Sequence, residues 1–259
     1  MRTFMLCILQ CLLLPLWAGT PQFEKREMVT AQGDTLLYRV LYPENYDASA
    51  SAKYPLVLFL HGAGERGTDN EKQLTHGAGQ FLNPVNREQY PAIVLFPQCP
   101  PDLYWGLDNR PENGLGNDKF PQNPPLSKAF TQVKELLDNF IGQGRVDTRR
   151  IYVVGLSMGG MGTFDMAARF PDLFAAAVPI CGGICPERLA PAVKKVKFRI
   201  FHGDADDIVP VDNSRQIYTY LKESGADVEY IEFPGCNHGS WNPAFNRPDF
   251  MEWLFKQKK

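Results

Sequence analysis

The stretch that decides the fold is IYVVGLSMGGMG, residues 151–162, in which β-branched and aromatic residues run into a glycine-rich turn around Ser157. Turns of this kind cradle phosphates, pack helices closely or display a nucleophile. A phosphate-binding loop needs a lysine after its last glycine, and none is present. A dinucleotide-binding turn needs a third glycine, where Asp165 stands here. The glycines therefore either pack a helix or expose the serine.

The residues around the serine satisfy the pattern G-x-S-x-G between Gly155 and Gly159. In a nucleophile elbow, a buried strand enters this turn and a helix leaves it, so the serine is held at strained backbone angles above the sheet edge. The first turn of the helix adds free N–H groups and a partial positive charge. We therefore predict that Ser157 is a nucleophile, and that Gly160 and Gly162 let the helix lie close to the sheet.

Short uninterrupted runs of Val, Ile, Leu and Phe recur along the chain, most of them bounded by proline or glycine. Such runs are typical of strands that are buried on both faces of a parallel sheet. They cover residues 54–61, 92–97, 151–155, 196–203 and 228–235. Two earlier segments, residues 23–30 and 35–42, flank the turn Gln32-Gly33-Asp34 and predict a hairpin.

Apolar residues at helical spacing lie between these runs and predict helices over residues 126–141, 158–169, 213–223 and 249–255. Strands that alternate with helices indicate an α/β fold. We expect a mainly parallel sheet flanked by helices, with an antiparallel N-terminal hairpin at its edge. Residues 21–259 are assigned to one such domain.

The first 20 residues contain one arginine, an apolar run and then small residues, which is the layout of a secretory signal peptide. Cleavage after Ala18 or Thr20 would release a secreted or periplasmic protein. The apolar run is too short and too poorly flanked to predict a membrane span. An uncleaved N-terminal anchor and a lipid anchor on Cys11 are the alternatives.

The composition excludes some classes of partner and site. With 27 basic and 29 acidic residues, the formal charge is −2, so no basic surface suggests nucleic-acid binding. Four cysteines follow the signal peptide, and in an oxidising compartment they allow up to two disulfides in three pairings. They are Cys99, Cys181, Cys185 and Cys236. Their spacing is not that of a zinc site, so we expect no metal.

A nucleophilic serine needs a general base. Of the four histidines, His238 lies in a loop after the last predicted strand, from which it can reach over the serine. His61 and His202 each end a strand in His-Gly and are expected to orient their loops through backbone hydrogen bonds. His76 has no motif around it and is expected to pack at the surface or on a helix.

The base in turn needs an acid that holds its tautomer and stabilises the imidazolium. The segment HGDADDIVP, residues 202–210, offers Asp204, Asp206 and Asp207 after a strand end. A chain order of serine, aspartate and histidine is that of the hydrolase elbow architecture. The spacing alone leaves the choice among the three carboxylates open.

Residues 99–125 are dense in Pro, Gly and Asn and show no periodicity. A stretch of this length without secondary structure is unusual unless it serves as a lid or binding loop. It follows a strand end, the edge where α/β sheets bind ligands. We expect Tyr104 and Trp105 to form an aromatic platform for substrate there; the alternative is that they only anchor the loop.

Four motifs in order carry a resemblance to a known family: HGAG at residues 61–64, GLSMGG at 155–160, HGDADDIVP at 202–210 and NHGSW at 237–241. With them, nearly the whole chain after the signal peptide resembles the α/β-hydrolase superfamily. It is most similar to the secreted esterase and predicted-peptidase branch near polyhydroxybutyrate-depolymerase-like, feruloyl and acetylxylan esterases. The resemblance implies the α/β-hydrolase fold and no metal or organic cofactor.

The resemblance also assigns roles to residues. Similar carboxylesterases carry HG-D-x-D-x-x-V-P with the second aspartate as catalytic acid, which here is Asp206, with Asp204 as the alternative. The oxyanion hole is expected to use the backbone N–H groups of Met158 and Ala63, with Gly64 in place of Ala63 as the alternative. Trp241 is expected either to pack the histidine loop or to line the leaving-group pocket.

We therefore predict a secreted serine carboxylesterase with the triad Ser157, Asp206 and His238 and an acyl-enzyme intermediate. Its substrates are small or polysaccharide-linked esters, such as acyl groups on plant polysaccharide. A serine peptidase of the prolyl-oligopeptidase-like kind shares the same core and is the first alternative. A non-catalytic hydrolase-fold binding protein is the second, although such proteins typically lose a triad member. The sequence makes no prediction of the oligomeric state.

Overall fold

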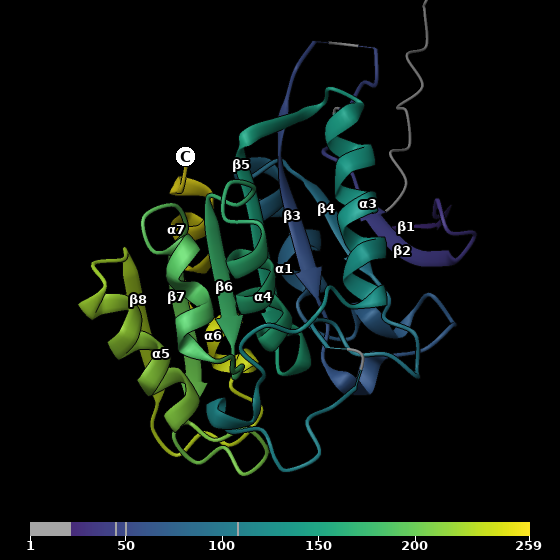
Figure 1. Cartoon of the computed structure of the whole chain (residues 1–259). Helices are drawn as coiled ribbons and strands as arrows, with labels where there is room; N and C mark the ends of the chain where they lie inside the picture. The colour runs from purple at the N-terminus through teal and green to yellow at the C-terminus, as the bar shows by residue number, and fades with distance from the viewer. Residues whose placement is uncertain (1–21, 45, 50, 108) are drawn as a thin grey trace, which may run out of the picture.

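The computed structural model describes residues 22–44, 46–49, 51–107 and 109–259, so the predicted signal peptide lies outside the described residues. An eight-stranded sheet forms its centre, in the order β1-β2-β4-β3-β5-β6-β7-β8 (Figure 1). The strands are β1 (Glu24–Val29), β2 (Thr35–Leu41), β3 (Tyr54–Leu60), β4 (Ile93–Pro97), β5 (Val146–Leu156), β6 (Ala176–Ile180), β7 (Lys197–Gly203) and β8 (Val228–Phe233).

The N-terminal hairpin lies at one edge of this sheet, as predicted. β1 pairs antiparallel with β2, and β2 pairs antiparallel with β4. Gly33 makes the turn at φ 83°, and its N–H donates to the Thr30 carbonyl. A positive φ is a conformation that glycine adopts without steric cost.

All other strand pairs are parallel, from β4 through β3, β5, β6 and β7 to β8. Nearly all residues of β3, β4 and β6, and those of β5 from Ile151 to Leu156, are buried, which explains their unbroken apolar sequences. Parallel strands end at a common edge, so the loops that follow β3, β4, β5, β6, β7 and β8 gather there. That edge is where the predicted site residues lie.

Helices cover both faces of the sheet. One hydrophobic core joins the sheet to α3 (Lys128–Gly142), α4 (Met158–Arg169) and α5 (Asp212–Glu223). A second core on the other face joins it to α1 (Ala78–Leu82), α6 (Trp241–Phe245) and α7 (Phe250–Lys256). Figure 1 shows α3 and α7 on opposite sides of the sheet. The remaining helical turns are α2 (Pro84–Gln89), η1 (Ala63–Glu65), η2 (Lys72–Leu74), η3 (Asn117–Lys119) and η4 (Pro186–Ala192).

The structure contains elements that the sequence did not predict. β6 was missed because its sequence, AAVPI, is short, rich in alanine and contains Pro179. The strand predicted at residues 151–155 is the last part of the longer β5. Helix α4 matches its predicted bounds at both ends, whereas α1, α2 and α6 have only five or six residues and too little periodicity to be recognised.

Candidate active site

Ser157 alone turns the chain from β5, which ends at Leu156, into α4, which begins at Met158. Its backbone angles, φ 53° and ψ −117°, lie in a region that residues with a side chain rarely adopt. The Ser157 N–H donates to the Ile180 carbonyl at 2.9 Å, which ties the turn to the end of β6. The chain therefore contains the strained strand-to-helix turn that the G-x-S-x-G pattern predicts.

The glycines around this turn are required by close backbone contacts. A Cβ atom on Gly155 would lie 2.3 Å from the Gly159 carbonyl oxygen, and one on Gly159 would lie 1.9 Å from the Leu60 carbonyl oxygen. A Cβ on Gly160 would lie 2.3 Å from the Ile180 carbonyl oxygen, so Gly160 does bring α4 close to the sheet. A side chain at any of these positions would push the helix away from the sheet.

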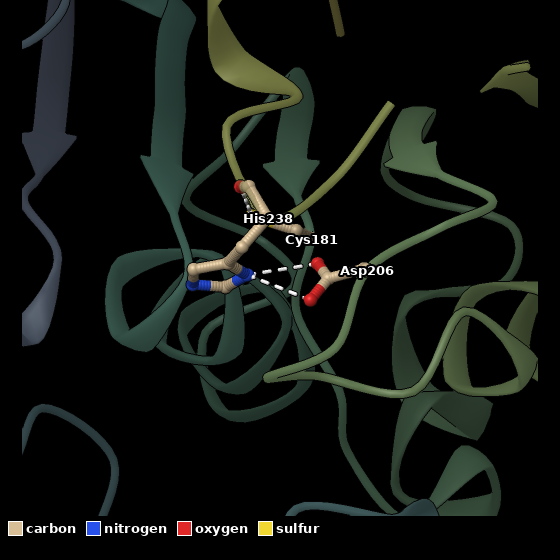
Figure 2. A group of neighbouring side chains, drawn as sticks. All are labelled: Cys181, Asp206 and His238. Atoms are coloured by element: carbon tan, nitrogen blue, oxygen red, sulfur yellow. Dashed lines mark hydrogen bonds and ion pairs between the residues drawn. The ribbon is translucent and has the colours of Figure 1, made fainter. Parts of the chain in front are cut away.

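The structure brings Ser157, His238 and Asp206 together at the carboxyl edge of the sheet. His238 Nε2 lies 2.9 Å from Ser157 Oγ, and His238 Nδ1 lies 2.8 Å from Asp206 Oδ2 and 3.0 Å from Oδ1. Figure 2 shows the Nδ1 edge of the His238 ring turned toward the carboxylate, with Nε2 on the far side of the ring. A proton on Nδ1 leaves a lone pair on Nε2, which can accept the serine proton.

The Asp206 side chain is fully buried and its oxygens are well supplied with donors. The N–H groups of Ile208 and Val209 both donate to Oδ1 at 2.9 Å. Burial by itself would raise the pKa of Asp206, but hydrogen bonds from His202, His238 and these two N–H groups hold it well below its usual range. Asp206 therefore stays ionised and can stabilise an imidazolium on His238.

The neighbouring carboxylates face elsewhere. Asp204 is exposed, and its Oδ1 accepts a hydrogen bond from the Gly235 N–H, which joins the loop after β7 to the loop that carries His238. Asp207 is exposed as well. Of the three aspartates in this loop, Asp206 is the one in contact with His238.

The two residues expected to supply oxyanion donors lie on adjacent segments. Met158 is the first residue of α4, where N–H groups have no partner within the helix. Ala63 begins η1, directly after Gly62, whose Cβ would lie 3.0 Å from the Leu156 side chain. Gly64, the alternative donor, is more exposed than Ala63. The loop after β3 thus runs beside the serine turn, as an oxyanion hole requires.

Arg66 fixes the loop after β3. Its Nε donates to the Ala63 carbonyl at 3.0 Å, and its Nη1 donates to the carbonyls of Pro101 and Leu103. Its guanidinium also lies 5.1 Å from the centre of the Tyr104 ring. Arg66 therefore joins this loop to the long loop after β4.

The prediction of Trp105 as a substrate platform is wrong. Its side chain is fully buried, stacks 6.3 Å from Phe130 and donates from Nε1 to the His61 carbonyl at 2.9 Å. The Ser127 hydroxyl donates to the Trp105 carbonyl. Trp105 anchors the long loop to the core, which was the alternative interpretation.

Tyr104, the other residue of the predicted platform, is half-buried and lines a cavity beside Met158. The cavity is narrow, with a volume of about 20 Å³. Its apolar lining comes from Tyr104, Leu107, Pro111, Phe120, Met158, Met161 and Ile184, and Asp165 and Arg188 lie at its polar end. Tyr104 is therefore placed where it can contact a group bound near the serine.

Trp241 packs on the histidine loop. Its ring meets His238 edge-on at 5.5 Å between ring centres, and on its other side it lies 5.0 Å from His76. His76 Nε2 lies 3.8 Å from a carboxylate oxygen of Glu65, in the loop after β3. His76 thus packs against the site, a contact that no sequence motif predicted.

His61 and His202 lie where the sequence placed them, at strand ends, and both are buried. His61 Nδ1 lies 2.6 Å from the Gly62 carbonyl, and its Nε2 accepts from the Cys99 N–H at 3.0 Å. Burial lowers the pKa of His61 to about 4, so the ring is neutral and its role is to hold the loop. His202 contacts Asp206, and the sequence reasoning missed that contact.

Cys181 follows β6 and lies against the same residues, within 4.8 Å of ligand atoms of Asp206 and His238 (Figure 2). A thiolate, a carboxylate and an imidazole are metal ligands by type. However, burial raises the pKa of Cys181 to about 12, and both Asp206 oxygens already accept hydrogen bonds. These residues fit a hydrogen-bonded network better than a metal site.

The four cysteines considered for disulfides, Cys99, Cys181, Cys185 and Cys236, are free thiols in this structure. Three of them are buried, and Cys236 is half-buried. Among the residues that the structure describes, none of the helices combines the length and apolar character needed to cross a bilayer.

Comparison with known proteins shows the family and the fold of the chain. Residues 46–248 match the model of a family described as phospholipase/carboxylesterase. A probable carboxylesterase of Oryza sativa subsp. japonica is 25% identical over 209 residues, which cover 76% of each chain. A solved structure of a thermostable esterase is 38% identical, with a TM-score of 0.79, and covers 92% of this chain.

The chain is shorter than some of these relatives. It spans 63% of the thermostable esterase. A protein of Arthroderma benhamiae that is described only as secreted is 25% identical, and the match covers 92% of this chain but 28% of the fungal protein.

Proposed function

The chain belongs to the phospholipase/carboxylesterase family of the α/β-hydrolase superfamily, and on that premise we propose that it is a serine carboxylesterase. The observation that carries the proposal is one line of contacts, in which Ser157 at φ 53° meets His238 Nε2 at 2.9 Å and His238 Nδ1 meets Asp206 at 2.8 Å. Nucleophile, base and orienting acid are thus within hydrogen-bond reach of one another.

In the first half of the reaction, Ser157 Oγ attacks the ester carbonyl carbon while its proton moves to His238 Nε2. The carbonyl oxygen becomes an oxyanion, which the N–H groups of Met158 and Ala63 stabilise. Asp206 keeps the Nδ1 proton in place and stabilises the imidazolium. When the tetrahedral intermediate collapses, His238 returns the proton to the leaving alcohol, and the acyl group stays on Ser157.

In the second half, a water molecule takes the place of the alcohol. His238 removes one proton from it as the oxygen attacks the acyl-enzyme, and Ser157 then leaves and recovers its proton from His238 Nε2. The products are one carboxylic acid and one alcohol. These reaction steps need no group other than the residues named and water.

The cavity beside Met158 supports an acyl-binding role, with Tyr104 as one wall. At about 20 Å³ it is far smaller than usual ligand pockets, so its apolar lining favours the smallest acyl groups. A long fatty acyl chain exceeds it. Trp241 contacts His238, so we assign it to the opposite, leaving-group side.

We further propose that the protein is exported through the signal peptide at residues 1–20 and removes acyl groups from plant polysaccharide. The apolar leader supports export, and the narrow pocket beside Met158 favours small acyl groups such as acetyl. N-terminal sequencing of protein recovered outside the cell tests the cleavage. A panel of acetyl, feruloyl and octanoyl esters tests the substrate class, and a preference for octanoyl would contradict it.

The decisive test compares the wild type with Ser157→Ala on p-nitrophenyl acetate and on a peptide p-nitroanilide. We expect the wild type to cleave the ester and the variant to lose at least about 10³-fold in kcat, since the residual rate comes from binding and the oxyanion hole. A fluorophosphonate should label the wild type at one site. Wild-type turnover by the variant would remove Ser157 from the mechanism, and faster cleavage of the anilide would favour a peptidase.

A further inference from the structure

His202 contacts the same carboxylate as His238, from the opposite side. His202 Nε2 lies 3.2 Å from Asp206 Oδ2, and His202 Nδ1 lies 2.7 Å from the hydroxyl of Ser214 on α5. The side chains of His202, Asp206 and Ser214 are all fully buried. The contacts therefore run in one line from Ser157 through His238, Asp206 and His202 to Ser214.

The partners of His202 determine where its proton lies. Nε2 faces two acceptors, Asp206 Oδ2 and the Val209 carbonyl at 3.1 Å, so Nε2 must carry a proton. Nδ1 faces a hydroxyl, which donates to a neutral ring and accepts from a charged one. Ser214 thus satisfies the ring with the proton on Nε2. This N–H is shared between the Val209 carbonyl at 3.1 Å and Asp206 Oδ2 at 3.2 Å, and through the second contact His202 stabilises the carboxylate.

We propose, on the basis of the esterase function above, that His202 and Ser214 form a second serine–histidine pair that positions Asp206 and sets the basicity of His238. The Ser214 hydroxyl holds the His202 ring in place. The ring in turn holds Asp206 Oδ2 next to His238 Nδ1. His202 is a positioning residue, because it acts on the reacting atoms only through Asp206 and His238.

The donors around Asp206 determine how strongly its negative charge attracts the proton on His238. Each donor to Asp206 withdraws part of the negative charge that would otherwise attract the proton on His238. Loss of the His202 donor leaves that charge concentrated on the His238 side, which favours the imidazolium form of His238. The base would then be protonated, and inactive, over a wider range of acid pH.

Other titratable groups face this network and remain in every variant proposed below. They are Cys181 at the end of β6, Asp204 beside Asp206, Glu232 on β8, Cys236 in the loop that carries His238, and His76 beyond Trp241. A change in pH dependence that appears only when His202 or Ser214 is altered is therefore due to that pair.

The test is the pH dependence of kcat/KM for p-nitrophenyl acetate, whose acid limb reports the general base of the free enzyme. In His202→Leu we expect the acid limb to move to higher pH by about 0.5–1 unit, the direction that loss of a donor to Asp206 gives. His202→Gln keeps an N–H donor and should move it less. Ser214→Ala, which weakens the donor without removing it, should give a smaller shift of the same sign, and Ser214→Thr should restore the wild-type limb.

A merely structural role would lower the amplitude of the profile without moving the limb. Ser127→Ala is the matched control, since Ser127 is an equally buried serine that caps α3 and lies outside the network. If His202→Leu does not fold, the two Ser214 variants carry the test. An unmoved limb in folded His202→Leu or, failing that, in Ser214→Ala would overturn the proposal.

Proton NMR gives a second readout that needs no turnover. The wild type should show exchange-protected imidazole N–H resonances at low field from His238 Nδ1 and His202 Nε2, in addition to that of the buried His61 Nδ1. His202→Gln should remove the His202 resonance and shift that of His238, and an unshifted His238 resonance would overturn the proposal. Ester hydrolysis that survives Ser157→Ala would instead contradict the proposed serine mechanism, so the two failures are distinguishable.

Discussion

Replacing Asp206 with asparagine tests the network at its centre, because the change is isosteric and removes only charge and acceptors. The N–H groups of Ile208 and Val209 donate to Oδ1, so the amide oxygen would take that position and keep both bonds. The amide NH₂ would then replace Oδ2, where it faces His238 Nδ1 and His202 Nε2. Both nitrogens carry protons in the wild type, so the NH₂ group would face two other donors, of which His202 Nε2 alone has a second acceptor, the Val209 carbonyl.

The amide oxygen at the Oδ1 position stays 3.0 Å from His238 Nδ1, but the NH₂ group takes the nearer position at 2.8 Å and faces the Nδ1 proton. Moving that proton to Nε2 relieves the conflict, and Nε2 then cannot accept from Ser157. In a comparable triad this wrong tautomer costs about 10⁴ in kcat. That factor corresponds to about 5.4 kcal/mol of transition-state stabilisation. We expect a loss of this size in Asp206→Asn, with little change in KM, since the substituted atom is buried beneath the histidine.

The assay is steady-state hydrolysis of p-nitrophenyl acetate at pH 7, with near-UV circular dichroism to verify folding. Asp204→Asn is the matched control, because Asp204 is exposed and accepts a single hydrogen bond from Gly235. It should retain activity within about threefold, since exposed substitutions have small effects. A folded Asp206→Asn within tenfold of the wild type, or a larger loss in Asp204→Asn, would refute the reasoning.

Three more outcomes can be measured. Ser157→Gly should be more stable to urea than Ser157→Ala by about 1 kcal/mol, because glycine adopts φ 53° freely. This reverses the usual order, in which alanine is the more stable. An Ala variant that is the more stable would show that the turn is unstrained. Burial would raise the pKa of Asp147, but hydrogen bonds from Arg149 and Arg150 lower it to about 2. The ionised Asp147 therefore contributes fully to folding stability above pH 4, and this contribution is lost as the pH falls through 2. Asp147→Asn should therefore lower the urea midpoint at pH 7 and have little effect at pH 2, and an equal effect at both would contradict this. Met161→Ala should enlarge the acyl cavity and raise the octanoate-to-acetate rate ratio about tenfold, the scale of a few methylenes in a pocket; an unchanged ratio would place the acyl group elsewhere.

Sequence patterns predicted those parts of the fold that local physics determines. Strands buried on both faces must be apolar throughout, which made most of the parallel sheet readable, and the hairpin was readable from the Gly33 turn. β6 was missed because alanine has little preference for strands. Its alanines are small, which lets α4 pack closely against this strand. Its position is set by pairing with β5 and β7, which are distant in sequence.

In the site, too, local motifs could be predicted and contacts between distant segments could not. The motif around Ser157 and the order of Asp206 and His238 could be read directly, since each lies in a recognisable loop. Trp105 was misjudged because an aromatic residue in a polar loop looks the same in sequence whether it faces substrate or core. The contact of His202 with Asp206 depends on how the loop after β7 folds back over its own strand. Its other partner, Ser214, lies on a different element, and the spacing of residues in the sequence does not predict that contact.

The strain at Ser157 and the double support of Asp206 have a common physical logic. An unfavourable backbone conformation persists only when surrounding contacts fix it, and here the Ile180 carbonyl on one side and the Gly159 approach to Leu60 on the other leave the turn no alternative. A buried carboxylate likewise persists only with enough donors, and two N–H groups plus two histidines supply them. Nucleophile and acid are thus each held from the side that faces away from the substrate. His238, whose side chain is 19% exposed, is held by its contacts with Asp206 and Trp241, so it is the member of the three with room to move as the proton is transferred.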